Sequence, residues 1–306
     1  MHSQTPLPKQ KTSEHVSVMP QEVLQFLNPQ PECWYLDATF GSGGHTALLL
    51  KAGARVIALD WDLKAITAGQ DRFREQIEAG QLLLIHAPFS QLTDTLTRLK
   101  KEQKMTEQVS GCLFDFGTST MQLLSHERGF TFHKDGPLDM RMDTRLGVTA
   151  ADLLAALPEK QLAQLFKDFG GEEQAGSIAK AIKLQKNAPT TTTELVKIIE
   201  SVKRRQRSHL HPATKVFQAL RIAVNTELDE IATALPQALQ SLKPTGVLVT
   251  IAFHEGEDRI VKHTLRDWEA AGEGVSITKK PHTPNPEEVQ INPRARSAKL
   301  RAFQKN

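Results

Sequence analysis

The feature that most constrains the fold is a strand–turn–helix–strand unit in residues 35–60. A short apolar run is followed by three glycines within positions 41–44, an apolar helix over 46–52 and a second buried strand over 55–59. Glycines let a ligand approach the main chain closely, and the first N–H groups of the helix point towards it. Asp60 follows the second strand, where a carboxylate can accept hydrogen bonds from a ribose. The unit therefore predicts a nucleoside-cofactor site.

The glycine spacing separates two classes of cofactor. A dinucleotide fingerprint needs G-x-G-x-x-G, and Thr46 stands where the third glycine would follow Gly41 and Gly43. Asp37 would repel a pyrophosphate but would attract the ammonium of an amino-acid-bearing nucleoside. The pattern therefore favours S-adenosylmethionine over NAD. An ordinary tight strand–helix connection is the alternative without a cofactor.

Composition narrows the class of protein and its location. The 39% hydrophobic and 24% charged residues are typical of a soluble globular chain, and a net charge of +3 does not by itself indicate a nucleic-acid binder. The apolar runs are too short to cross a membrane. Cys33 and Cys112 have no zinc-ligand spacing, so we expect no metal, and two lone thiols fit a reducing cytoplasm. Residues 1–14 lack the apolar core of a signal peptide and are predicted to be a flexible arm.

Strands and helices alternate beyond the first unit, which predicts an α/β fold with a doubly wound, mostly parallel sheet. A helix is expected over 63–79, and further buried strands are expected over 82–85, 112–117 and 247–253. Asp115, like Asp37 and Asp60, stands at the carboxyl end of such a strand. Ligands bind at this edge of parallel sheets, so the three acids are candidates for one site.

Phe89 lies just past the third predicted strand, on the same rim as Asp60. Burial in the core is the commoner fate of a phenylalanine, whereas rim loops carry function and an aromatic ring can stack on adenine. Both interpretations remain open.

The alternation stops near residue 125. Four helical patterns follow without a strand, over 150–157, 159–169, 172–186 and 193–203, and they predict an inserted helical subdomain over 125–210. Pro212 is expected in the first turn of one long helix that returns the chain to the sheet. A last helix is expected over about 257–271. The tail, residues 279–306, holds seven Lys/Arg against two Glu and is predicted to be an extended basic segment.

Methyl transfer from a sulfonium is an in-line displacement that requires positioning and removal of a proton, and no covalent nucleophile. Asp139, in the acidic loop 135–143, could orient an exocyclic amine, although pairing of the loop acids with nearby arginines is the favoured interpretation. His254 could be a base, a substrate contact or a structural residue. The basic run 203–211 is predicted to contact phosphates, with a solvated linker as its alternative.

Five blocks together resemble the bacterial ribosomal RNA small-subunit methyltransferase H (MraW) family, and they cover nearly the whole chain. The blocks are Asp37–Thr46 (DATFGSGGHT), Arg128–Phe132 (RGFTF), Asp135–Asp143 (DGPLDMRMD), His211–Ile222 (HPATKVFQALRI) and Asn292–Arg301 (NPRARSAKLR).

The resemblance implies a class I, S-adenosylmethionine-dependent methyltransferase acting on the exocyclic N4 amine of one cytidine in 16S ribosomal RNA, near the decoding centre. It implies a methyltransferase domain over 15–124 and 211–306, with 125–210 as a substrate-recognition insert. We predict that the inserted helices and the basic segments bind the RNA backbone, and that the loops 115–122 and 135–143 contact the edge of the base. By the family pattern, the donor is held by Gly43, Gly44, His45, Asp60, Phe89, Asp115 and Gln122.

Asp37 joins the donor candidates from the charge argument, and Asp115 and Asp139 are the catalytic candidates. The chain departs from the family pattern at 115–120 (DFGTST for DLGVSS) and at 252–259 (AFHEGEDR for SFHSLEDR). These departures affect the expected positioning of substrate, and the family pattern does not identify the proton acceptor. Two rival functions remain: an NAD-dependent dehydrogenase and an RNA-binding module without a donor. The sequence leaves open whether the protein is a monomer or a homodimer, and whether its substrate is free RNA or the assembled small ribosomal subunit.

Overall fold

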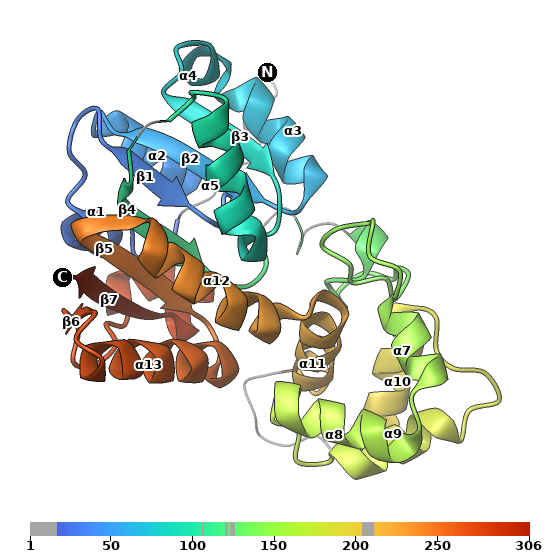
Figure 1. Ribbon diagram of the computed structural model, residues 1–306. Helices are drawn as coiled ribbons and strands as arrows, with labels where there is room; N and C mark the ends of the chain where they lie inside the picture. The colour runs from blue at the N-terminus through green and yellow to red at the C-terminus, as the bar shows by residue number, and fades with distance from the viewer. Residues whose placement is uncertain (1–16, 106, 120–121, 123–125, 204–210) are drawn as a thin grey trace, which may run out of the picture.

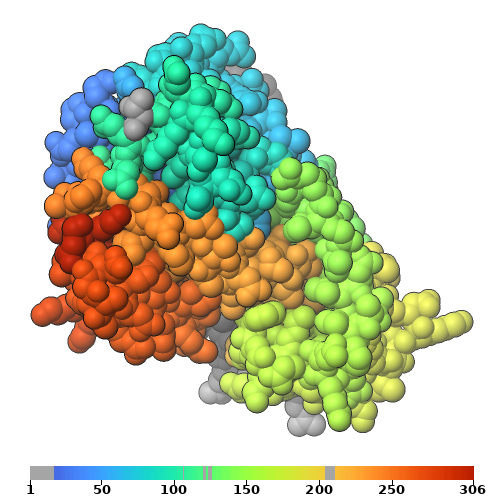
Figure 2. Space-filling model, in the orientation of Figure 1, coloured from blue at the N-terminus to red at the C-terminus, as the bar shows by residue number. Residues whose placement is uncertain are grey.

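A computed structural model describes residues 17–105, 107–119, 122, 126–203 and 211–306 of the chain. The expected N-terminal arm and residues 204–210 of the basic run lie outside the described residues. Figure 1 shows a sheet flanked by helices and, to one side, a group of helices connected to it through α11 and α12. In space-filling form this helical group projects from the body that carries the sheet (Figure 2).

Seven strands form one sheet in the order β3-β2-β1-β4-β5-β7-β6. The five strands from β3 to β5 pair in parallel, and β7 runs antiparallel to both of its neighbours. This confirms the expected doubly wound, mostly parallel sheet. The strands are β1 Trp34–Asp37, β2 Arg55–Asp60, β3 Leu82–His86, β4 Val109–Asp115, β5 Leu242–Ala252, β6 Gly274–Ser276 and β7 Lys299–Lys305.

The order of the strands changes direction between β1 and β4, which makes this the topological switch point of the sheet. The chain winds outward from β1 through β2 to β3 and then returns to place β4 on the other side of β1. The connections at the carboxyl ends of β1 and β4 therefore leave on opposite faces, which opens a crevice between them. Asp37, opposite Leu113, and Asp115 lie at this edge.

Helices cover both faces of the sheet (Figure 1). Successive strand residues alternate between the two faces, so Tyr35 packs in one apolar core and Leu36 in the other. The core on the Tyr35 side includes helices α1 Pro20–Leu27, α2 Gly44–Lys51 and α3 Leu63–Arg72. The core on the Leu36 side includes helices α5 Leu92–Lys101, α12 Glu227–Ser241 and α13 Glu255–Ala270.

Two helices expected to be continuous are broken. The helix predicted over 63–79 divides at Phe73 into α3 and α4 Arg74–Glu78, and the Phe73 ring packs edge-to-face on Phe40. The helix predicted from Pro212 begins at Thr214 and divides at Thr226, whose left-handed φ of 49° separates α11 Thr214–Asn225 from α12.

The basic tail is more ordered than its composition suggests. It contains α14 Pro286–Ile291 and then β7, which inserts between β5 and β6 with Phe303 fully buried. The buried residues of β7 contribute to both faces of the sheet: Leu300 and Ala302 pack in the core on the Tyr35 side, and Phe303 packs in the core on the Leu36 side. The prediction of an extended segment over 279–306 missed this strand because lysine and arginine dominated the count.

Four helices, α7 to α10, fill residues 150–202 and pack with α11 around a separate apolar core. Their order follows the helical patterns of the sequence: α7 Ala150–Ala156, α8 Glu159–Gly170, α9 Ala175–Lys183 and α10 Thr192–Val202. Capping boxes fix the starts of α7 and α10, through Thr149 and Thr191. Short 3-10 turns η1 Phe89–Gln91, η2 His126–Arg128 and η3 Pro293–Ser297 complete the described elements. Among the described helices, none has the length and hydrophobicity needed to cross a bilayer.

Candidate active site

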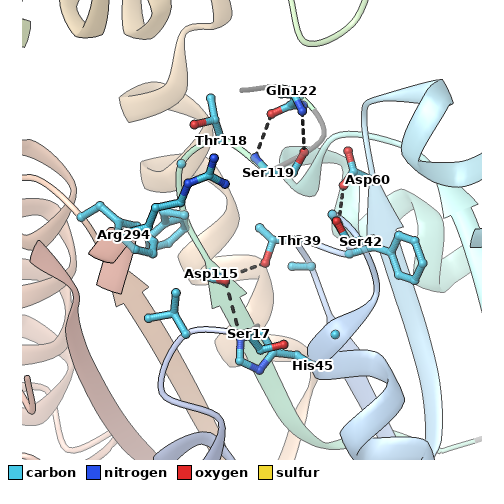
Figure 3. Close-up of a pocket in the computed structure, with 18 of the residues that line it drawn as sticks. Ser17, Thr39, Ser42, His45, Asp60, Asp115, Thr118, Ser119, Gln122 and Arg294 are labelled. Atoms are coloured by element: carbon cyan, nitrogen blue, oxygen red, sulfur yellow. Dashed lines mark hydrogen bonds and ion pairs between the residues drawn. The ribbon is translucent and has the colours of Figure 1, made fainter. Parts of the chain in front are cut away.

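A cavity of about 610 Å³ opens at the carboxyl ends of the strands, at the switch point between β1 and β4. Its walls come from the glycine turn, the ends of β2 and β4, the β5–α13 turn, the α11–α12 junction and residues 291–294. Figure 3 shows how side chains from these distant segments converge, with Asp115 near the centre and Arg294 on the opposite wall from Asp60. The volume lies within the range of small-molecule sites.

The glycine turn forms one wall. Gly43 has a left-handed φ of 74°, and a Cβ there would lie 2.6 Å from the Phe73 ring and 2.7 Å from Phe40. No other residue fits this position without displacing the two rings. Gly44, at the start of α2, lines the cavity, whereas Gly43 lies behind it.

Asp37 does not line the cavity. Its carboxylate is fully buried and accepts hydrogen bonds from Thr46 Oγ1 at 2.7 Å and from the Thr39 N–H at 3.2 Å. Burial raises the pKa of this carboxyl. The structure thus places Asp37 one layer behind the position that the charge argument expected, where it ties the glycine turn to α2.

Asp60 lies on the cavity wall at the end of β2. Its two carboxylate oxygens accept one backbone N–H each, from Gly41 at 2.7 Å and from Asp62 at 2.8 Å. Burial raises the pKa of Asp60 to about 7, against the opposing effect of these two hydrogen bonds. Each oxygen keeps a lone pair for a further donor, such as a ribose hydroxyl.

Asp115 and His45 face each other across the cavity floor (Figure 3). His45 Nε2 lies 3.5 Å from Asp115 Oδ2, a contact without hydrogen-bond geometry. Asp115 Oδ1 and both ring nitrogens of His45 are buried and have no hydrogen-bond partner among the described residues. Burial alone would lower the pKa of His45, but the carboxylates of Asp115, Asp37 and Glu288 together outweigh it and the pKa is raised. Buried polar atoms without partners indicate a polar ligand at this point.

Phe89 is both a core residue and a residue of the cavity wall, the two positions that the sequence left open. It belongs to the core, with rings of Trp61 and Phe114 at 5.8 Å from its own, and it also lines the cavity beside Trp61. Gln122 is buried at the rim, where its amide accepts from the Ser119 N–H at 3.0 Å and donates to Asp62 Oδ2 at 3.2 Å. Both residues are therefore placed to contact a nucleoside.

The acidic loop supplies mainly structural contacts. Asp139 forms a two-point ion pair with Arg141, at 2.7 and 2.8 Å, and does not line the cavity. Burial alone would raise the pKa of Asp139, but the Arg141 guanidinium outweighs this effect and the pKa is lowered. Asp135 accepts from the Thr193 N–H at the start of α10. Met142, at the end of this loop, does reach the cavity.

His254 is a structural residue in this arrangement. It caps α13, with Nδ1 accepting from the Gly256 N–H at 3.1 Å. The sequence-based assignment did not include Trp61, Arg221, Glu227, Glu257 and Arg294, which all line the cavity. Trp61 follows Asp60 directly in the sequence, so its position just past a predicted strand could have identified it as a residue of the cavity rim. The other four come from segments whose proximity depends on the tertiary fold.

The cavity fits an adenosyl donor in three respects. It has a carboxylate with free lone pairs, aromatic walls, and unpartnered polar atoms on Asp115 and His45 beside a helix N-terminus. A doubly wound sheet with a ligand crevice at its switch point is shared by many nucleotide-binding enzymes, and the contents of this crevice fit a methyltransferase whose donor is S-adenosylmethionine. The chain belongs to the MraW methylase family, whose pattern it matches over residues 12–306.

Curated relatives agree with this assignment. The chain is 42% identical to "Ribosomal RNA small subunit methyltransferase H" of Sorangium cellulosum, over 99% of this chain and 94% of the relative. It is 43% identical to the protein of the same name from Brucella ovis, over 94% of this chain and 86% of the relative. Among solved structures, SMU.1697c of Streptococcus mutans, crystallised with SAH, is 12% identical, with a TM-score of 0.46 over 95% of this chain and 100% of that one.

Proposed function

We propose that the protein transfers a methyl group to the exocyclic N4 amine of one cytidine in 16S ribosomal RNA, near the decoding centre of the small ribosomal subunit. The observation that carries this proposal is the identity of 42% to a small-subunit ribosomal RNA methyltransferase over nearly the full length of both chains. An enzyme acting on ribosomal RNA works in the cytoplasm, and we propose that location.

The residues of the cavity divide the work of holding the donor. Asp60 accepts from ribose hydroxyls, and Phe89, with Trp61, borders the adenine. Gly43 shapes the turn so that Gly44 and the first N–H groups of α2 face the ligand. His45, Asp115 and Gln122 provide the polar contacts around the amino-acid portion, while Asp37 acts from behind by fixing the turn.

The bound donor supplies an electrophilic methyl group. The acceptor base must leave any stack and enter the cavity, so that its amine can be read by hydrogen bonds. Asp115 Oδ1 is buried and without a partner, and we assign it to accept a hydrogen bond from the N4 amine, which orients the nitrogen lone pair. Asp139, held by Arg141, supports the loop that carries Met142 to the cavity.

The decisive experiment uses small ribosomal subunits from cells that lack this modification. Incubation with methyl-labelled S-adenosylmethionine and the protein, followed by nucleotide mapping, is expected to place the label on N4 of a single 16S cytidine. Label on a different atom or a different RNA would contradict the proposal. Stabilisation by NAD and not by S-adenosylhomocysteine in a thermal-shift assay would favour the dehydrogenase instead.

A further inference from the structure

The cavity has a second group of charged residues, which the donor contacts do not use. Arg221, Glu227 and Glu257 line it together with the apolar side chains of Ile231 and Phe253. We call these five residues the acceptor region. Phe253 and Glu257 follow β5, which lies on the opposite side of β4 from β1 and β2 in the sheet. The acceptor region therefore approaches Asp115 from the side away from Asp60.

Arg221 is held in one orientation by Glu227. Its Nε–H donates to Glu227 Oε1 at 2.8 Å and its Nη2–H to Oε2 at 2.8 Å, across the break in the helix at Thr226. The side chains of Arg221 and Glu227 are only 16% and 6% exposed. A two-point pair of this kind fixes the plane of the guanidinium as well as its position.

One end of the guanidinium is left without a protein acceptor. Nη1 and Nη2 of Arg221 each carry two N–H groups, and the hydrogen bonds that Arg221 forms with the described residues use only the Nε–H and one N–H of Nη2. Among the described residues, no Arg221 nitrogen is one of the fully buried side-chain atoms that lack a partner, so this end of the guanidinium is accessible from the cavity and can donate to a bound group. The chemistry that fits is a planar group with two adjacent acceptor atoms.

The other members of the region supply charge and shape. Glu257 Oε2 accepts from the N–H groups of Phe253 and His254, at 2.7 and 3.2 Å, and its Oε1 lies 3.2 Å from His254 Nε2. Because Nδ1 of His254 accepts from the backbone, a neutral ring carries its proton on Nε2, towards Glu257. Ile231 and Phe253 offer an apolar surface to a ring.

A metal ion is the competing occupant. Glu227, His254 and Glu257 can each present one ligand atom within 4.8 Å of the others. A cation there would have to displace the Arg221 guanidinium from Glu227 and the proton from His254 Nε2. The existing contacts therefore favour an organic acceptor group on Arg221.

We propose that Arg221 reads the acceptor base, with one N–H of Nη1 and the second N–H of Nη2 donating hydrogen bonds to the O2 and N3 edge of cytosine while the N4 amine faces Asp115. This rests on the proposed function and adds the residue that determines base specificity. Uracil has no amine at position 4 to accept the methyl group, and its N–H at position 3 would face an Arg221 donor, which disfavours its binding. Glu227 is a positioning residue, because it acts by fixing the guanidinium.

The test combines two enzyme variants with a base analogue. Small subunits are reconstituted with 16S RNA that carries cytidine or 3-deazacytidine at the nucleotide mapped for the wild-type protein; the analogue replaces the N3 acceptor with C–H. Arg221→Lys keeps a cation beside Glu227, and Arg221→Met removes it. Any intrinsic effect of the analogue on reactivity is the same for the wild-type protein and its variants. For each variant, comparing the four combinations of enzyme and base therefore isolates the contact between Arg221 and N3.

We expect the wild-type protein to lose about 10²-fold in kcat/KM on the analogue, and both Arg221 variants to lose about 10²-fold on cytidine but little more on the analogue. Glu227→Gln should show a reduced sensitivity to the analogue. Affinity for S-adenosylhomocysteine, measured by calorimetry, should stay unchanged in all of them. The matched control is Arg301→Met, which breaks a similar two-point pair with Asp258 at 2.8 and 3.2 Å, away from the cavity, and should keep the full sensitivity.

Several results would overturn the inference. These are a full analogue penalty in Arg221→Lys, wild-type rates in either Arg221 variant, or loss of the donor affinity, which would assign Arg221 to the donor. Activity that is lost in EDTA and restored by a divalent cation would assign the acidic cluster to a metal. Failure of the wild-type protein to methylate any small subunit is a separate result, because it contradicts the proposed function itself.

Discussion

The two sides of the cavity are built in different ways. The donor side is concentrated in one stretch: Asp37, the glycine turn and Asp60 all lie within residues 37–60, so local pattern and spacing bring them together. The acceptor region is assembled from the α11–α12 junction and the β5–α13 turn, which meet only after the sheet has formed. The difference teaches that a cofactor site can be read from a short sequence, whereas the substrate pocket beside it depends on long-range assembly.

Asp115 stands between the two sides, so its removal should have the largest effect. Asp115→Ala is expected to lower the rate of methylation by at least about 10³-fold. Stability should be unchanged or slightly higher, because the substitution removes a buried oxygen that has no partner. Labelled-donor assays and thermal unfolding check both parts, with Asp115→Asn as the isosteric control. Full turnover by the alanine variant would remove Asp115 from the active site.

The donor side should be sensitive to the geometry of its turn. Gly43→Ala combines a left-handed φ with a clash against Phe73, and we expect a loss of about 2–4 kcal/mol in the free energy of unfolding. Gly80→Ala is the matched control: its φ is 69°, but nothing lies within 4 Å of the added Cβ, so about 1 kcal/mol is expected. Equal losses in urea unfolding would show that the packing of the turn on the two rings does not matter.

Donor affinity should depend on pH through Asp60. Burial raises its pKa to about 7, so between pH 4 and 7 the folded protein without donor holds a proton that the unfolded chain has lost, and stability falls as pH rises through this range. The ribose hydroxyls favour the carboxylate form, and donor binding should therefore release the proton.

Binding at pH 6, where about one tenth of Asp60 is ionised, should be about tenfold weaker than at pH 8. Calorimetry at the two pH values measures this ratio, and Asp60→Asn should abolish the dependence. The same slope in that variant would point to His45, whose pKa is also raised.

The smallest effect is expected outside both sides of the cavity. Asp139→Asn weakens a partly exposed pair with Arg141 and should cost less than about 1 kcal/mol, with the rate of methylation nearly unchanged. A steady-state assay on small ribosomal subunits suffices. A loss of 100-fold or more, with normal unfolding, would return Asp139 to the catalytic centre.

The sequence predicted the sheet and the helices well where the periodicity of apolar residues alone determines the type of element. The acids that end β1, β2 and β4 predicted the edge at which the cavity opens, because strand ends are visible as the limits of apolar runs. Asp37 shows the limit of such reasoning, since its position was right but its carboxylate is turned inward to Thr46. The helical periodicity of apolar residues did not predict the break between α11 and α12 at Thr226, because the apolar positions continue in phase on both sides of it. For the same reason the pairing of Arg221 with Glu227 could not be predicted.

The central claim is that an adenosyl donor occupies the crevice between β1 and β4. A crystal structure of the protein with S-adenosylhomocysteine tests it most directly. We predict ligand density inside the cavity, with ribose oxygens about 3 Å from the Asp60 carboxylate and the adenine beside Phe89. A ligand bound elsewhere, or a crevice that remains closed by its own side chains in a crystal grown with saturating ligand, would contradict the account.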